Sequence, residues 1–155
     1  MSFVVKAVAA LAGLALIGAL YVRMAPSDPA AWHVDPMSGV DTGAPNQFRV
    51  APPGASLDAD IASPVWPVAP AELAARFDAA AMAAPRTTRL AGGPDELFTT
   101  YVQRSALIGF PDYVSVRAVE AEGGAALAIW SRSRFGYGDM GVNRARVERW
   151  IAALD

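Results

Sequence analysis

The stretch SRSRFGYGDMGVNRAR, residues 131–146, decides how the C-terminal half of this chain folds. It begins at the end of a strand-like apolar run, crosses a glycine-rich turn and enters a segment with the spacing of an amphipathic helix. On the way it collects four arginines, one aspartate and one asparagine. Because so many polar groups meet where a strand passes into a helix, a functional site is expected here if the protein has one.

Side chains of the strand that leads into this stretch, residues 125–134, alternate between two faces. Trp130, Arg132 and Arg134 share one face of it. Two arginines on one face cannot both be buried without partners. Asp112 and Asp139, which lie just outside the adjoining strands, are the nearest candidate partners.

Two interpretations of this cluster stay open. In the first it is a structural corner, where Asp139 caps the following helix, Asn143 bonds to the turn, and Arg132 or Arg134 lies in a salt bridge. In the second, the arginines and the exposed amides of residues 136–141 bind an anion at the start of the helix. The candidate ligand-binding residues are Arg104, Asp112, Arg132, Arg134, Asp139, Asn143 and Arg144.

Residue types that carry catalysis are scarce in this sequence. It contains no cysteine, and its one histidine, His33, lies in a proline-rich segment away from the strands. It therefore offers no Ser/His/Asp set, no Cys/His pair and no spacing of metal ligands. The formal charge of −2 and the pI near 5.3 argue against a nucleic-acid partner. We expect no catalytic residue, metal or cofactor, and favour a non-enzymatic role.

The N-terminal residues 3–22 form an apolar stretch that only Lys6 interrupts. About 20 such residues are needed to cross a bilayer, so we expect residues 1–24 to be a transmembrane anchor in the lipid bilayer. A cleaved signal peptide is the alternative, but its apolar core is usually only about 7–15 residues long. Sparse positive charge after Arg23 favours a cytoplasmic N-terminus. We therefore expect a single-pass protein of the bacterial inner membrane with a periplasmic domain.

The rest of the chain has the pattern of an α+β fold. Residues 25–69 are rich in proline and are expected to be an extended linker. Residues 70–155 are expected to form the domain, unless it begins at about residue 46 with a short strand. Helices are expected at residues 71–83 and 142–154, and strands at residues 87–90, 97–105, 113–120 and 125–134. This order predicts a small antiparallel β-meander with two helices packed on one face.

The junction also resembles a known family. Residues 131–147 are similar to the signature of the bacterial and plastid domain-of-unknown-function family fourteen-ninety-nine, and RSALIGFPDY, residues 104–113, looks like its second motif. The resemblance covers about residues 46–154. Many relatives carry a cysteine-containing segment ahead of the domain, which this chain lacks. Membership implies a fold and an exported or membrane-linked setting, but no activity.

Two functions follow from these patterns. The first is an accessory or interaction module on a membrane anchor, associated with a larger membrane complex through a membrane-protein partner. The second is a binding module for a small anionic ligand or a lipid headgroup at the arginine-rich junction.

Overall fold

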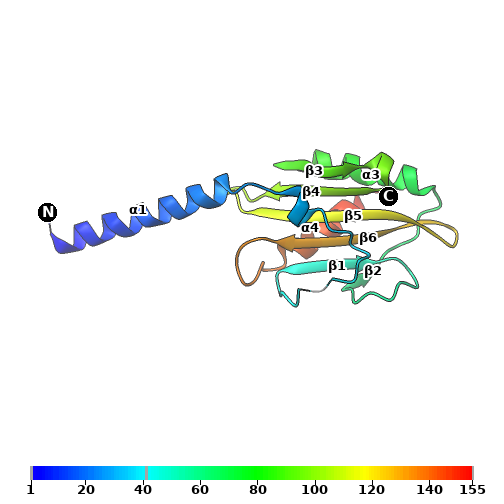
Figure 1. The fold of residues 1–155 in the computed structure, drawn as a ribbon, viewed down its shortest axis with the longest axis horizontal. Coiled ribbons are helices and arrows are strands. Elements are labelled where there is room, and N and C mark those ends of the chain that lie inside the picture. Colours follow the sequence, from blue (N-terminus) through cyan, green and yellow to red (C-terminus); the bar gives the residue numbers. More distant parts are fainter. Residues whose placement is uncertain (1, 41, 155) are drawn as a thin grey trace.

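The fold is α+β and is built on one six-stranded sheet (Figure 1). It is described from a computed structural model that covers residues 2–40 and 42–154. The strand order is β2-β1-β6-β5-β4-β3, and only β1 and β2 are parallel. The strands are β1 (Gln47–Ala51), β2 (Ile61–Ala62), β3 (Thr87–Gly93), β4 (Phe98–Arg104), β5 (Pro111–Ala121) and β6 (Gly124–Ser133). The helices are α1 (Phe3–Met24), α2 (Pro29–Trp32), α3 (Pro70–Ala83) and α4 (Val142–Ala152), with the 3-10 turn η1 (Pro94–Glu96) between β3 and β4.

Strands β3 to β6 form the antiparallel meander that the sequence predicts. In β5 and β6, Val114 lies opposite Ser131 and Tyr113 lies opposite Arg132. Since neighbouring residues of a strand point to opposite faces, this register places Val114 and Ser131 on one face of the sheet and Tyr113 and Arg132 on the other. The alternation predicted for residues 125–134 is therefore confirmed.

Helices α3 and α4 cover one face of the sheet, which is the arrangement that the sequence predicts. Phe77 of α3 and Trp150 of α4 meet edge to face with their ring centroids 5.8 Å apart. Trp150 meets Tyr101 of β4 in the same way at 5.9 Å. All three side chains are almost completely buried, so the main core lies between the two helices and the sheet.

The opposite face of the sheet is covered by the segment around α2 (Figure 1). Trp32 stacks on Tyr113 with the ring centroids 3.9 Å apart, and His33 stacks on Phe98 at the same distance. The hydroxyl of Ser27 shares a hydrogen bond of 2.9 Å with that of Tyr113. The chain that follows α1 is thus fastened across the second face of the sheet.

Residues 25–69, which we expect to be an extended linker, contribute to the sheet and to the core. They supply β1, which pairs with β6, and Phe48, Val50 and Trp66 of this segment are buried in the main core. Prolines limit the length of helices and strands here but do not prevent packing, because β1 lies between two prolines rather than across one. The linker boundaries and the start of the domain at residue 70 stay predictions.

Helix α1 projects from one end of the sheet (Figure 1). It has 22 residues, which corresponds to a length of about 33 Å, and none of its side chains is buried. Among the described residues it is the one helix that is long and apolar enough to cross a membrane. A single helix of this kind at the N-terminus fits a membrane anchor or a signal sequence.

Candidate functional site

The sheet divides the predicted arginine-rich cluster into two groups on opposite faces. Asp112, Asn143 and Asp139 lie under α4, on the helix-covered face. Arg132 and Arg134 lie on the other face, beside the segment that leads out of α1. The two groups therefore have different surroundings and have to be considered separately.

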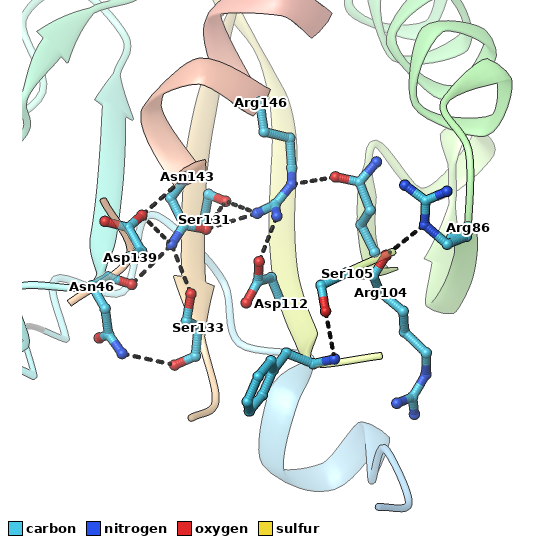
Figure 2. Close-up of polar contacts among 12 residues, drawn as sticks. Asn46, Arg86, Arg104, Ser105, Asp112, Ser131, Ser133, Asp139, Asn143 and Arg146 are labelled. Carbon is cyan, nitrogen blue, oxygen red and sulfur yellow. Dashed lines mark hydrogen bonds and ion pairs between the residues drawn. The ribbon is translucent and has the colours of Figure 1, made fainter. Parts of the chain in front are cut away.

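Below α4, the centre of the first group is Arg146, which was not among the predicted site residues (Figure 2). Its guanidinium forms an ion pair with Asp112, and the two side chains are only 4% and 11% exposed. Nε donates to the side-chain oxygen of Gln103 at 2.6 Å, and Nη1 donates to Asn143 Oδ1 at 2.7 Å and Ser131 Oγ at 3.1 Å. Arg146 thereby connects α4 to the three strands β4, β5 and β6.

Asn143 and Asp139 hold the beginning of α4 against the end of β6 and the residue before β1 (Figure 2). Asp139 accepts hydrogen bonds from the backbone N–H of Asn143 at 2.8 Å and of Gly141 at 3.1 Å. The Asn143 amide donates to the Asn46 carbonyl and the Ser133 hydroxyl, each at 3.0 Å. These contacts are the ones that the first interpretation gives to Asp139 and Asn143, but its salt bridge of Arg132 or Arg134 does not occur among the described residues.

The acidity of Asp139 reflects these contacts. Burial acts to raise the pKa of the Asp139 carboxyl, but the hydrogen bonds from the backbone N–H groups of Asn143 and Gly141 and from the Asn143 side chain outweigh it and hold the pKa below its usual value. The carboxylate therefore stays charged at neutral pH, as a cap at a helix N-terminus requires.

The expectation that Asp112 and Asp139 are the partners of Arg132 and Arg134 is wrong. Asp112 pairs with Arg146, and Asp139 caps α4. The sequence places all of these residues near one corner, but the sheet lies between the arginines of β6 and the two carboxylates. In the part of the chain that the structure describes, no carboxylate lies within ion-pair distance of Arg132 or Arg134.

Arg132 is a buried cation that is held by uncharged groups. Its Nη2 donates to the Trp32 carbonyl at 2.6 Å, while Nη1 donates to the Trp130 carbonyl and the Ser115 hydroxyl, each at 3.2 Å. The guanidinium also lies over the Trp130 ring, 3.9 Å from its centroid. Of its five N–H groups, Nε–H and one on Nη2 have no acceptor among the described residues.

Burial makes the charged form of Arg132 less favourable than it would be in water. Arg132 is only 6% exposed. Burial, and then the positive charge of Arg49, lowers the pKa of Arg132 to about 10. The residue is still cationic at neutral pH, so a desolvated positive charge persists on this face of the sheet.

A groove opens beside this charge. It has a volume of about 670 Å³ and is bordered by the chain before β1, by the end of β6 and by α2. We call it the Arg132 groove. The residues lining it include Trp32, Asn46, Trp130, Arg132, Arg134 and Tyr137, and none of the described lining residues is acidic. It thus combines two arginines with aromatic walls.

The other predicted site residues lie outside this groove. Arg104 donates to the carbonyl oxygens of Gly109 at 2.9 Å and Ala25 at 3.1 Å, and so joins a loop to the end of α1. Arg144 is exposed on α4, where it lies over the Phe48 ring and 3.5 Å from Glu148. The structure therefore does not bring the seven predicted residues into one site.

His33 reaches the sheet in spite of its distance from the strands in the sequence. Its Nδ1 lies 2.9 Å from the hydroxyl of Thr100, which in turn lies 3.0 Å from that of Ser115. Thr100 and Ser115 are fully buried, so these hydroxyls are not accessible to a substrate. Burial is the main reason that the pKa of His33 is lowered. No three or more His, Asp or Glu side chains of the described residues gather as a metal site.

Together, the six-stranded sheet and the one long apolar helix of the described residues define a small α+β protein. The chain belongs to the family described as "Protein of unknown function (DUF1499)", whose profile matches residues 39–154. This confirms the resemblance carried by residues 131–147. The match includes Arg132 and Arg134 but begins after α1 and α2. No curated protein and no solved structure shows a significant match to the chain.

Proposed function

We propose that this protein is a membrane-anchored binding module whose Arg132 groove takes an anionic group attached to an apolar or aromatic body. A phosphate ester has this chemistry, whether it is free or is the headgroup of a phospholipid. The observation that carries the proposal is Arg132 itself, a buried guanidinium without a carboxylate partner among the described residues, beside a groove that Arg134 also lines.

The energetics of Arg132 favour an anionic ligand over a neutral one. A charge removed from water loses hydration, and carbonyl dipoles replace only part of it. An anion that meets the free Nε–H and Nη2–H of Arg132 would supply the missing countercharge through charge-assisted hydrogen bonds. By contrast, Arg146 has a carboxylate partner in Asp112 and three further hydrogen bonds within the protein, which supports a structural role for the polar network under α4.

The rings around the groove favour an organic ligand over a bare ion. Trp32 and Tyr137 lie along its walls and provide aromatic surface next to the charge, whereas the Trp130 ring is already covered by the guanidinium groups of Arg49 and Arg132. Such pockets bind the body of a ligand through apolar contact and orient it through a few polar groups. A phospholipid headgroup with the first part of its chains, or a phosphate ester of similar shape, matches that combination.

The proposed setting is the periplasmic side of a bacterial inner membrane, with α1 as a retained anchor. Support comes from the length of α1, from its exposed apolar surface and from the small amount of positive charge that follows it in the sequence. Protease treatment of intact and opened spheroplasts tests this orientation. Cleavage of the domain in intact spheroplasts supports it, and protection until the membrane is opened contradicts it.

Thermal unfolding of the full chain in a neutral detergent tests the binding proposal. The probes are inorganic phosphate, glycerol phosphate and short-chain phosphatidylglycerol, each titrated separately. A ligand that binds only the folded state stabilises it by RT ln(1 + L/Kd), where L is the free ligand concentration, so the unfolding temperature rises once the ligand concentration exceeds Kd. We expect short-chain phosphatidylglycerol to act at lower concentration than inorganic phosphate, because it also contacts the aromatic walls.

Two groove variants and one matched control make this test specific. Arg134→Gln removes a groove charge from a half-buried residue, and Arg132→Lys keeps the charge but removes the planar fork. Arg149→Gln makes the same charge change on the exposed side of α4. We expect both groove variants to weaken the ligand-induced shift at least tenfold in ligand concentration, while Arg149→Gln leaves it unchanged. Equal shifts in all the proteins, or no shift with any anion, would overturn the proposal.

An accessory role beside a larger membrane complex is the second candidate. The observation that favours it is α1, none of whose side chains is buried, so that its apolar surface is available to a partner helix as well as to lipid. Gentle solubilisation followed by size-exclusion chromatography tests it. Elution of the tagged chain with a second membrane protein supports this role, and elution as a single small species contradicts it.

A further inference from the structure

Two loops at the end of the sheet where α1 is attached carry the most exposed apolar side chains outside α1. One loop, residues 105–110, joins β4 to β5, and the other, residues 134–141, joins β6 to α4. Leu107 is 91% exposed, Tyr137 is 88% exposed and Met140 is fully exposed. We call these two segments the anchor-side loops.

The anchor-side loops are placed at one end by the pairing of the strands. Pro111, which starts β5, pairs with Arg104 at the end of β4, and Asp112 pairs with Ser133 at the end of β6. Both loops therefore leave the sheet at the same end of the strands. Figure 1 shows α1 leaving from this end, while the turn between β5 and β6 lies at the opposite end.

The connection between α1 and this end of the domain is short and well packed. α1 ends at Met24, and Ala25, the next residue, is buried. The carbonyl of Ala25 accepts a hydrogen bond from Arg104 at 3.1 Å, and that of Pro26 accepts one from Arg134 at 2.6 Å. No flexible linker separates α1 from the sheet. The anchor-side loops therefore stay close to the C-terminal end of α1.

The anchor-side loops are braced in a way that presents their tips outward. The hydroxyl of Ser105 accepts hydrogen bonds from the backbone N–H of Gly109 at 3.1 Å and of Phe110 at 3.0 Å. The rings of Phe110 and Phe135, one from each loop, are 6.0 Å apart. With their bases fastened in this way, Leu107 and Met140 remain outside the packed part of the domain.

The charges around these loops complement a phospholipid surface. A pocket of about 350 Å³ beside the end of α1 is lined by Arg23, Arg86 and Arg104, and none of its described lining residues is acidic. Arginines that flank exposed apolar and aromatic side chains are typical of protein segments that lie in the headgroup region. Of the acidic residues near this end, Asp112 is paired with Arg146, Asp139 accepts hydrogen bonds at the start of α4, and the exposed Asp28 accepts one from the backbone N–H of Ala30.

From this arrangement we propose that the anchor-side loops are a second membrane contact. Leu107, Tyr137 and Met140 enter the interfacial layer of the bilayer that α1 spans, and Arg23, Arg86 and Arg104 contact lipid phosphates. The domain is then seated with the α1 end of its sheet against the lipid, and the Arg132 groove, which Tyr137 borders, opens close to the headgroups. This inference rests on the proposed membrane anchoring by α1 and is independent of what the groove binds.

Depth-dependent quenching in the full chain tests the inference. The natural sequence contains no cysteine, so single cysteines can carry an environment-sensitive fluorophore without further changes. Labels are placed by Leu107→Cys and Met140→Cys in the two loops, by Leu14→Cys in α1, and by Glu122→Cys in the opposite turn as the matched control. The chain is reconstituted in phosphatidylcholine vesicles that contain a minority of phosphatidylglycerol and lipids with spin labels at different depths.

We expect the labels at residues 107 and 140 to emit at shorter wavelength and to be quenched at least threefold more than the label at residue 122, most strongly by shallow spin labels. Quenching at residue 14 without quenching at residues 107 and 140 would overturn the loop contact and leave the anchor intact. Loop labels that shift in wavelength but escape quenching would mean that a protein covers them, which also overturns the proposal. Lack of quenching at all four positions would overturn the anchoring and the loop contact together.

Discussion

Arg146 of α4 and Asp112 of β5 form an ion pair that is almost completely enclosed between the helix and the sheet. Arg132 and Arg134, which belong to the same stretch of sequence as Arg146, take no part in it. The pair joins the last helix to the middle of the meander, and the hydrogen bonds of Arg146 to Gln103 and Asn143 complete its surroundings. The corner at residues 131–146 is therefore held by one buried charge pair.

Removing one member of the Asp112–Arg146 pair is expected to destabilise the fold strongly. Asp112→Asn or Arg146→Met leaves the other charge buried without a partner, and breaking such pairs costs about 3–5 kcal/mol. The double variant is expected to lose less than the sum of the two single losses, since no unpaired charge remains. Denaturant unfolding of the full chain in detergent measures these free energies.

The exposed pair of Arg144 and Glu148 on the same helix provides the control. Arg144→Met is expected to change the free energy of unfolding by less than about 1 kcal/mol, because solvent screens the interaction. If Arg144→Met and Arg146→Met were equally costly, burial would not be the cause of the difference and this account of the corner would fail.

Loss of the Asp139 carboxylate is expected to weaken the start of α4. Asp139→Ala removes the acceptor for the backbone N–H groups of Asn143 and Gly141, and loss of a helix cap typically costs about 0.5–2 kcal/mol. Asp139→Asn keeps an acceptor oxygen and is expected to lose less. Hydrogen exchange of the first turn of α4 measures the effect, and unchanged protection in Asp139→Ala would contradict it.

A side chain at position 124 is expected to disrupt the contact between β6 and the chain before α3. Gly124 has φ +150°, and a Cβ there would lie 1.9 Å from the carbonyl oxygen of Trp66. The backbone groups of Trp66 and Ala125 exchange two hydrogen bonds of 2.9 Å, so neither chain can move away without breaking them. Gly124→Ala is expected to cost at least about 1–3 kcal/mol, the usual range for backbone strain.

Gly138→Ala is the matched control for position 124. Gly138 has no atom within 4 Å of an added Cβ and no positive φ. The free energy of unfolding is expected to change by no more than about 0.5 kcal/mol, as at ordinary surface positions. A similar loss in both alanine variants would show that glycine flexibility, rather than the close approach of Trp66, determines the effect.

Acidification is expected to reduce stability through His33. Burial is the main cause that lowers the pKa of His33; Glu96 acts against it, and Arg117 reinforces it. Because the unfolded chain binds this proton more tightly, the free energy of unfolding falls as pH decreases below about 6.5 towards the lower pKa of the folded state. Carboxyl groups with ordinary pKa values near 4 do not titrate in that window.

The measurement is the unfolding temperature of the full chain between about pH 7 and pH 5.5. His33→Gln keeps a hydrogen-bonding side chain near Thr100 but has no titration in this range. Its unfolding temperature is expected to vary less with pH than that of the natural chain, whatever its value at neutral pH. Equal slopes in the two proteins would exclude His33 as the source.

Much of the fold follows from local sequence patterns. The alternation in residues 113–120 and 125–134 predicts β5 and β6, and the spacing of Leu73 and Phe77 predicts α3. These patterns work because a residue's burial depends on the period of its own helix or strand. The family signature in residues 131–147 is likewise a local feature, and the profile match confirms it.

The composition of the candidate site was predicted only in part. Four of the predicted residues lie in the signature stretch, namely Arg132, Arg134, Asp139 and Asn143. They were predicted from their residue types alone. Arg146 was missed, although it lies in the same stretch, because only the packing of α4 on β5 shows that its side chain points inward. Its place one turn before the apolar Trp150 was a usable signal, since residues four apart share a helix face.

By itself, the sequence determined that the chain has an apolar N-terminal helix, a β-meander and two amphipathic helices, because each depends on the order of neighbouring residues. Only the tertiary structure decided which charges meet. Strand pairing put Asp112 and Arg132 on opposite faces, and the chain after α1 folded back so that Trp32 lies over Tyr113. A charge finds its partner through contacts across the fold, and local periodicity carries no information about them.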